Sequence, residues 1–194
     1  MLIAQTPRLI LRRLTLADAD ALLAVFGDAE VMRYGDGVRS LAWVLGWLAD
    51  CLARYDQGQP APWAIVERGG DDRAIGYCGL FTYGDVNGRP EVELGYRLAR
   101  AYWGRGYATE AARAVLDYAF RVLGLARLIA LIDPDNVASI RVAEKLGMTH
   151  EADALLPGYT HPDRVYAIAL GPGIGDWGLG VRGWGVPQSP TPNP

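Results

Sequence analysis

The chain has 194 residues, of which 51% are hydrophobic and 21% are charged, and this balance predicts one soluble globular domain with a sizeable core. The net charge of −3 argues against a nucleic-acid partner or an anionic membrane surface. No apolar run reaches the length of a membrane-spanning helix, and the N-terminus lacks the pattern of a signal peptide. We therefore expect a cytoplasmic protein.

The cysteines and histidines exclude further classes of protein. Cys51 and Cys78 fall in predicted regular elements, and we expect both to be reduced core residues. His150 and His161 have no cysteine or histidine neighbours at the spacing of metal ligands, so the sequence predicts no metal site.

Strands and helices can be placed along the chain from the spacing of its apolar residues. Seven segments show the alternation or the short apolar run of β-strands: residues 8–14, 63–66, 74–80, 91–98, 128–132, 148–154 and 165–170. Four helices are predicted from apolar spacing and caps, beginning at Thr15 (with Asp18 completing a capping box), Ser40, Ala108 and Asp135. Glycine and proline make up half of residues 171–194, so we expect a disordered tail after a domain of residues 1–170.

The most informative stretch is EVELGYRLARAYWGRGYATEAARAVLDYAF, residues 91–120. It opens with the alternation of a strand, in which Gly95 predicts a bulge or a close approach of another backbone. Gly104 and Gly106 follow in a loop, and an amphipathic helix comes next. A strand, a glycine loop and a helix start expose free backbone N–H groups, so this arrangement can bind a phosphate.

This stretch resembles motif A of the GNAT acyltransferase superfamily, whose loop reads Gln/Arg-x-x-Gly-x-Gly/Ala. Gly106 and Ala108 match the last two positions, whereas Trp103 stands at the Gln/Arg position. The run WGRGYATEA is similar to the branch that acetylates the N-termini of ribosomal proteins, and the resemblance extends from about Arg8 to Leu170. It implies an α+β fold, with a mixed, mostly antiparallel twisted sheet of about seven strands and four main helices on its faces.

The resemblance also implies acetyl-CoA as cosubstrate. The loop amides would bind the coenzyme A diphosphate, and the pantetheine arm would lie along the preceding strand. The implied cofactor-binding residues are Tyr96, Arg97, Leu98, Trp103, Gly104, Arg105, Gly106, Tyr107, Ala108, Thr109, Asn136 and Ser139.

Two residues are candidates for the chemistry. Glu93 stands where this branch commonly carries a glutamate that faces the cleft, and it would act as general base through water. The alternatives are an anchor for the substrate amine and a solvated strand glutamate without a catalytic role. Ser139 would reach the departing sulfur, or would only satisfy the start of its helix. Many superfamily members carry a proton-donating tyrosine four residues later, and this chain has Ala143 there. The resemblance implies that the oxyanion donor is a backbone N–H near Leu94 or Gly95, exposed by a strand bulge.

The predicted function is N-acetyltransferase, with direct acetyl transfer in a ternary complex and no metal. The acceptor is a protein N-terminal α-amine or a small-molecule amine, and the enzyme is a monomer or a homodimer. One alternative is a non-catalytic acyl-CoA-binding sensor on the same fold, which the missing tyrosine keeps open. A dinucleotide-binding domain fits poorly, because no acidic residue ends a second strand about 20 residues after the glycine loop. Tyr34, Trp43 and Trp47 would contact the acceptor or simply pack in the core.

Overall fold

The computed structural model describes residues 1–35 and 37–170, and within them eight strands form one sheet. The strands are β1 (Leu2–Gln5), β2 (Leu9–Arg12), β3 (Pro62–Glu67), β4 (Ala74–Val86), β5 (Arg89–Leu98), β6 (Arg127–Ile132), β7 (Thr149–Ala154) and β8 (Asp163–Ala169). The helices are α1 (Ala19–Phe26), α2 (Leu41–Asp56), α3 (Tyr107–Arg121) and α4 (Val137–Lys145), with short 3-10 turns η1 (Leu16–Asp18) and η2 (Arg100–Tyr102). None of the helices in the described residues is long and apolar enough to span a bilayer.

The sheet order is β1-β2-β3-β4-β5-β6-β8-β7, and only the β5–β6 pair is parallel. The predicted α+β class and the four helices are confirmed. The eighth strand is β1, which the sequence did not reveal because Ile3 and Ala4 are both buried and a register shift interrupts its pairing with β2. Its four residues therefore lack the alternation that marks a strand.

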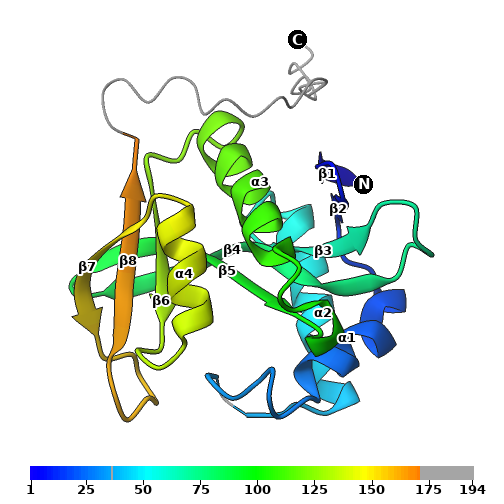
Figure 1. Cartoon of the computed structure of the whole chain (residues 1–194), viewed down its shortest axis with the longest axis horizontal. Coiled ribbons are helices and arrows are strands. Elements are labelled where there is room, and N and C mark those ends of the chain that lie inside the picture. The colour runs from blue at the N-terminus through cyan, green and yellow to red at the C-terminus, as the bar shows by residue number, and fades with distance from the viewer. Residues whose placement is uncertain (36, 171–194) are drawn as a thin grey trace.

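Helices cover both faces of the sheet, as Figure 1 shows. On one face Trp63 of β3 meets Tyr118 of α3 edge to face, at 5.1 Å between ring centroids. On the other face Tyr77 of β4 stacks on Phe26 of α1 and contacts Trp47 of α2. Because side chains alternate along a strand, these contacts assign α3 to one face and the α1–α2 pair to the opposite face.

The helix caps agree with the sequence except at α4. Ser40 accepts the N–H of Trp43, and Asp18 accepts both the N–H and the hydroxyl of Thr15. For α4 the predicted cap Asp135 is wrong by one position, because the Asn136 side chain accepts the helix N–H at 3.1 Å.

The apolar spacing of α2 predicts a buried stripe of Leu41, Val44, Leu45, Leu48 and Leu52. The structure instead buries Val44, Leu48, Cys51 and Tyr55 and leaves Leu41 and Leu45 exposed. Cys51 and Cys78 are buried free thiols, as expected. The predicted tail, residues 171–194, lies outside the described residues.

Candidate active site

The start of α3 leaves backbone donors free. Gly104 and Gly106 both have positive φ, at +73° and +78°, a conformation that glycine adopts without strain. Gly106 is the N-cap residue and offers no side chain, so the first N–H groups of α3, from Tyr107 to Thr109, have no capping partner. A side chain built at Gly104 would enter open space. The loop therefore presents bare donors at the positive end of a 15-residue helix.

Side chains from distant strands hold this loop in place. Arg8, before β2, donates to Glu110 of α3 at 2.7 Å and to the Arg105 carbonyl at 2.9 Å. Tyr107 donates its hydroxyl to Glu67 of β3 at 2.6 Å. On the other side of the loop, the indole N–H of Trp103 donates to the Leu98 carbonyl at 2.8 Å. Trp103 thus ties the loop to the end of β5, a structural role at the position where it departs from the superfamily motif.

The sheet opens beside this loop. Within the β5–β6 ladder only Glu93 and Ile129 are paired, and beyond them the two strands separate (Figure 1). The predicted bulge at Gly95 is wrong, because Gly95 pairs in register with Gly79 of β4. What Gly95 permits instead is close packing, since a side chain there would meet the Phe81 ring at 2.9 Å. Backbone groups of β5 are left without partners on this side by the separation of the strands.

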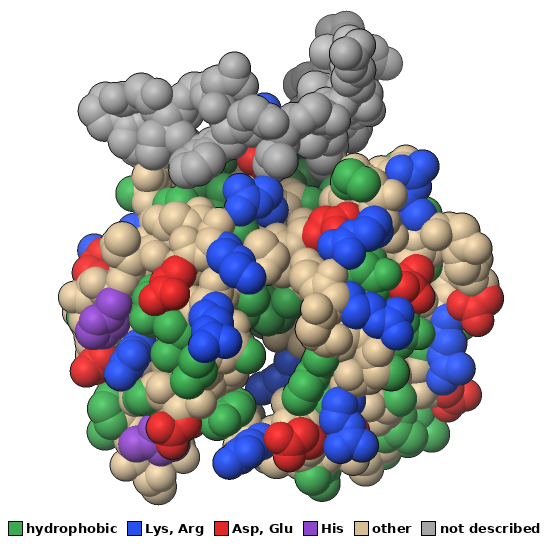
Figure 2. Space-filling model, in the orientation of Figure 1, with side chains coloured by type: hydrophobic (Ala, Val, Ile, Leu, Met, Phe, Trp, Pro, Cys, Tyr) green, Lys and Arg blue, Asp and Glu red, His purple; other side chains and the backbone are tan. Residues whose placement is uncertain are grey.

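The opening is visible from outside. Figure 2 shows a hollow near the centre of one face, with a basic side chain at its bottom.

The segment after α1 contacts the loop between β6 and α4, because Tyr34 donates its hydroxyl to the Asp135 carbonyl at 3.2 Å. Gly35 lies directly against the Arg97 guanidinium, which would have to move to admit a side chain at this position. Trp43 and Trp47 both pack on Phe26, and Trp43 is 38% exposed, so contact with the acceptor stays a prediction for it.

Glu93 lies on β5 at the point where the strands part. It is partly buried, and its carboxylate accepts the Leu131 N–H at 3.4 Å. Burial raises the pKa of Glu93 to about 7, against the lowering effects of hydrogen bonds from Tyr83 and Leu131 and of the Arg97 charge. Asp163 adds a smaller raising effect. A carboxyl group with this pKa can take up and release a proton near neutral pH.

Glu91, two residues earlier, has a different environment. It is buried and accepts ion-paired hydrogen bonds from Arg89 at 2.6 Å and Arg127 at 3.1 Å. Both arginines also bind Glu151 of β7, so this network joins β5, β6 and β7. Glu91 is therefore structural, and Glu93 is the strand carboxylate available for chemistry.

Ser139 lies in the first turn of α4. Its N–H is capped by Asn136, so its hydroxyl is not needed to satisfy the helix start. Ala143 is buried and carries no polar group. From β5, the Tyr96 side chain approaches Ser139 and interacts with it.

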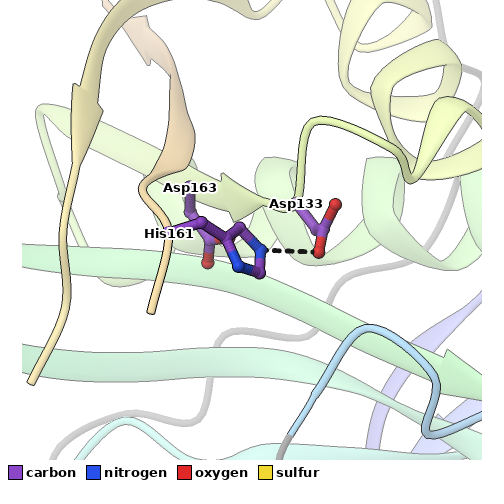
Figure 3. A group of neighbouring side chains, drawn as sticks. All are labelled: Asp133, His161 and Asp163. Atoms are coloured by element: carbon purple, nitrogen blue, oxygen red, sulfur yellow. Dashed lines mark hydrogen bonds and ion pairs between the residues drawn. The ribbon is translucent and has the colours of Figure 1, made fainter. Parts of the chain in front are cut away.

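A third group of polar side chains lines the end of β6 and the start of β8 (Figure 3). His161 Nε2 lies 2.9 Å from Asp133 Oδ2, and the polar atoms of Asp133, His161 and Asp163 lie within 4.8 Å of one another. Burial raises the pKa of Asp163, and the Asp133 charge raises it further. Sequence spacing did not reveal this cluster, because 28 residues separate its first two members. Tyr83 and Asp163, which act on Glu93, were missed for the same reason.

The start of α3 thus presents bare amides beside an opened sheet, with a titratable carboxylate on β5 and a hydroxyl on α4. Residues 8–149 match the family described as acetyltransferase (GNAT) domain. The chain belongs to the GNAT acetyltransferase family, and it is an N-acetyltransferase.

Relatives agree with this assignment. YkkB of Bacillus subtilis (strain 168) is 38% identical over 144 residues, covering 74% of this chain and 83% of that protein. The N-acetyltransferase p20 of Bacillus licheniformis is 34% identical over 151 residues, covering 75% and 82%. Spermidine N(1)-acetyltransferase of Escherichia coli (strain K12) is 30% identical over 128 residues, covering 66% of each chain.

Solved structures share the fold. A GNAT-family acetyltransferase from Bacillus anthracis aligns with a TM-score of 0.73 and 29% identity, over 87% of this chain and 98% of that one. The ribosomal L7/L12 α-N-protein acetyltransferase RimL, solved in complex with coenzyme A, aligns with a TM-score of 0.72 and 19% identity, over 88% and 98%. At that identity RimL shares the fold, and its acceptor does not carry over.

Proposed function

We propose that the protein transfers the acetyl group of acetyl-CoA directly to a primary amine within a ternary complex. One observation carries the proposal. The end of β5 after Glu93 runs from the β5–β6 opening to the loop before the uncapped start of α3. Glu93 and Ser139 would face the opening from opposite sides. This is the arrangement that a long thioester needs, with its phosphates held at one end and its reactive carbonyl at the other.

The residues at the helix start fit a diphosphate. The N–H groups from Gly104 to Thr109 would donate to its oxygens, and Arg8 and Arg105 lie at the same loop to balance its charge. The β5 residues from Tyr96 to Leu98 would lie along the pantetheine arm where β6 has moved away. Asn136 uses its side-chain oxygen as a cap, so its amide NH₂ is the part available to that arm.

Glu93 would take a proton from the acceptor ammonium, directly or through water, to give the neutral nucleophile. The amine nitrogen then attacks the thioester carbonyl carbon, and an N–H of the β5 backbone donates to the developing oxyanion. The nitrogen, which is positively charged after the attack, loses its second proton through water, and the oxyanion then re-forms the carbonyl. As the carbon–sulfur bond breaks, its electron pair goes to sulfur, the Ser139 hydroxyl donates a hydrogen bond to the thiolate, and the thiolate takes up a proton from solvent. Glu93 returns its proton to solvent, which its pKa of about 7 allows at neutral pH.

The acceptor is an amine that enters from the face covered by α1 and α2, where Glu93 and Arg97 lie. Two acceptor classes deserve a direct test. Spermidine is the acceptor named for one relative, and a protein N-terminus is the acceptor named for one structural neighbour. Asp133 and Asp163 near Glu93 favour acceptors that carry positive charge.

The test measures release of free coenzyme A thiol from acetyl-CoA with a panel of amines. The panel contains spermidine, putrescine, a neutral primary monoamine and short peptides with free or blocked N-termini. We expect amine-dependent thiol release that mass spectrometry matches to an acetylated product. Coenzyme A binding without turnover on any amine would favour the acyl-CoA sensor, and thermal protection by NAD but not by acetyl-CoA would contradict the cofactor assignment.

A further inference from the structure

Tyr96 of β5 carries a buried hydroxyl without a partner. In the described part of the chain its oxygen has essentially no accessible surface and accepts or donates no hydrogen bond of normal geometry. Nearly all buried polar atoms in folded proteins form hydrogen bonds, so a buried hydroxyl without one requires an explanation. Water cannot reach this oxygen in the present conformation, and a cofactor atom cannot reach it either. Its partner must therefore come from a side chain that already lies beside it.

Ser139 is that neighbour. Burial is the main cause that raises the pKa of the Tyr96 phenol, the Ser139 side chain acts in the opposite direction, and the Cys78 thiol adds a small raising effect. Burial also raises the pKa of Cys78, so this thiol stays neutral. A serine hydroxyl rotates about one bond, and rotation of Ser139 can bring its oxygen into hydrogen-bond range of the phenol.

Either hydroxyl of this pair can donate to the other. The phenol stays protonated at neutral pH, so it can act as the donor and Ser139 Oγ as the acceptor. Once its oxygen accepts from Tyr96, the Ser139 hydroxyl has its own hydrogen free to point away from β5. Because Ser139 lies in the first turn of α4 and β6 pairs with β5 only at Glu93, that hydrogen is free to donate to a group in the β5–β6 opening.

We propose that Tyr96 is a positioning residue that orients the Ser139 hydroxyl toward the departing sulfur, an inference that rests on the function proposed above. No proton leaves Tyr96 or Ser139 in this scheme. The carbon–nitrogen bond forms, the carbon–sulfur bond breaks with its electron pair going to sulfur, and the Ser139 O–H donates a hydrogen bond to the thiolate. Polarisation along the pair from Tyr96 to Ser139 strengthens that last hydrogen bond.

The test compares binding of coenzyme A with binding of desulfo-coenzyme A, in which hydrogen replaces the thiol, by calorimetry at pH 6.5 and pH 9. The ratio of the two dissociation constants isolates the contribution of sulfur. We expect the wild-type ratio to favour coenzyme A more strongly at pH 9, where more of the thiol is ionised. Tyr96→Phe should reduce that preference roughly 5- to 10-fold, the effect of losing one hydrogen bond, with little change in desulfo-coenzyme A affinity.

A double-mutant cycle separates positioning from independent effects. In a Ser139→Ala background, Tyr96→Phe should have no further effect on the ratio of dissociation constants. Ser139→Thr keeps the hydroxyl, so this variant should retain most of the wild-type preference for coenzyme A. Tyr118→Phe, on α3 against Trp63, is the control for loss of a phenol elsewhere in the core. Should Tyr96→Phe fail to fold, Ser139→Thr compared with Ser139→Val still shows whether the hydroxyl alone sets the preference.

The results distinguish this inference from the proposed function. If the wild-type protein binds neither compound, the proposed function itself is wrong. If the wild-type protein shows a sulfur-dependent preference that Tyr96→Phe leaves intact, or reduces equally with and without the Ser139 hydroxyl, Tyr96 does not act through Ser139 and only this inference is overturned.

Discussion

Replacing Glu93 with glutamine should make the protein more stable at alkaline pH while it loses activity. The pKa of Glu93 rises from an ordinary 4.5 to about 7 in the folded chain, chiefly because the carboxylate is buried. The folded state therefore binds a proton more tightly than the unfolded state, so the group's contribution to stability is fully present below pH 4.5 and is lost as pH rises through 7. The difference between the two values corresponds to about 3 kcal/mol above pH 7.

Urea denaturation at pH 5 and pH 8.5 measures this cost without any ligand. At pH 8.5, Glu93→Gln should raise the free energy of unfolding by about 2–3 kcal/mol, because the amide carries no charge to desolvate, and at pH 5 the gain should be small. Glu91→Gln is the matched control on the same strand: it removes the partner of Arg89 and Arg127 and should lower stability.

The same variant tests catalysis. With an active amine, Glu93→Gln should lower kcat/KM about 100-fold at pH 7.5, the lower range of general-base effects. The wild-type rate should rise with pH through about 7, and in the variant the rise should move to the pKa of the amine itself, about 8 for an α-amine. Equal stability of the two proteins at both pH values would refute the buried-carboxylate reasoning, and an unchanged rate profile would remove Glu93 from the mechanism.

Three further predictions concern the loop and α4. Gly106→Ala should lower the free energy of unfolding by about 1 kcal/mol, because the residue has a positive φ, and should weaken coenzyme A binding at least ~10-fold in calorimetry. Gly124→Ala, also at positive φ, is the control and should lower stability by a similar amount without changing the affinity. Burial raises the pKa of Glu110, but hydrogen bonds from Thr6 and Arg8 outweigh it and lower the pKa overall. Glu110→Gln should therefore lower the thermal midpoint at pH 7, and the difference from wild type should shrink as pH falls below 4.5. A difference that stays constant with pH would contradict this. Ser139→Ala should reduce kcat about 10-fold and leave the thermal midpoint unchanged; full turnover would leave only a structural role.

Local features of the site could be predicted from the sequence. The backbone of Gly104 and Gly106 and the helix that follows depend on neighbouring residues, so the geometry of this loop is encoded within one short stretch. The cap of α4 shows the limit of local reasoning: Asp135 and Asn136 both favour caps, and the position of the chain after β6 decides between them.

Other features depend on contacts between distant segments. The pKa of Glu93 depends on burial and on Tyr83 and Asp163, which lie 10 and 70 positions away in the chain. The buried Tyr96 hydroxyl lies beside Ser139 only because α4 packs against α3 and β6, next to β5. Period-two alternation placed Tyr96 on a strand, and no periodicity could identify which helix it would meet. The opening after Glu93 likewise appears only once β6 is paired and then diverges.

A crystal structure of the protein with coenzyme A tests the central claim most directly. We expect the diphosphate to accept hydrogen bonds from the N–H groups between Gly104 and Thr109, and the sulfur to lie in the β5–β6 opening within hydrogen-bond range of Ser139. Density for the diphosphate at any other surface, or a sulfur outside the opening, would contradict both the proposed site and the chemistry derived from it.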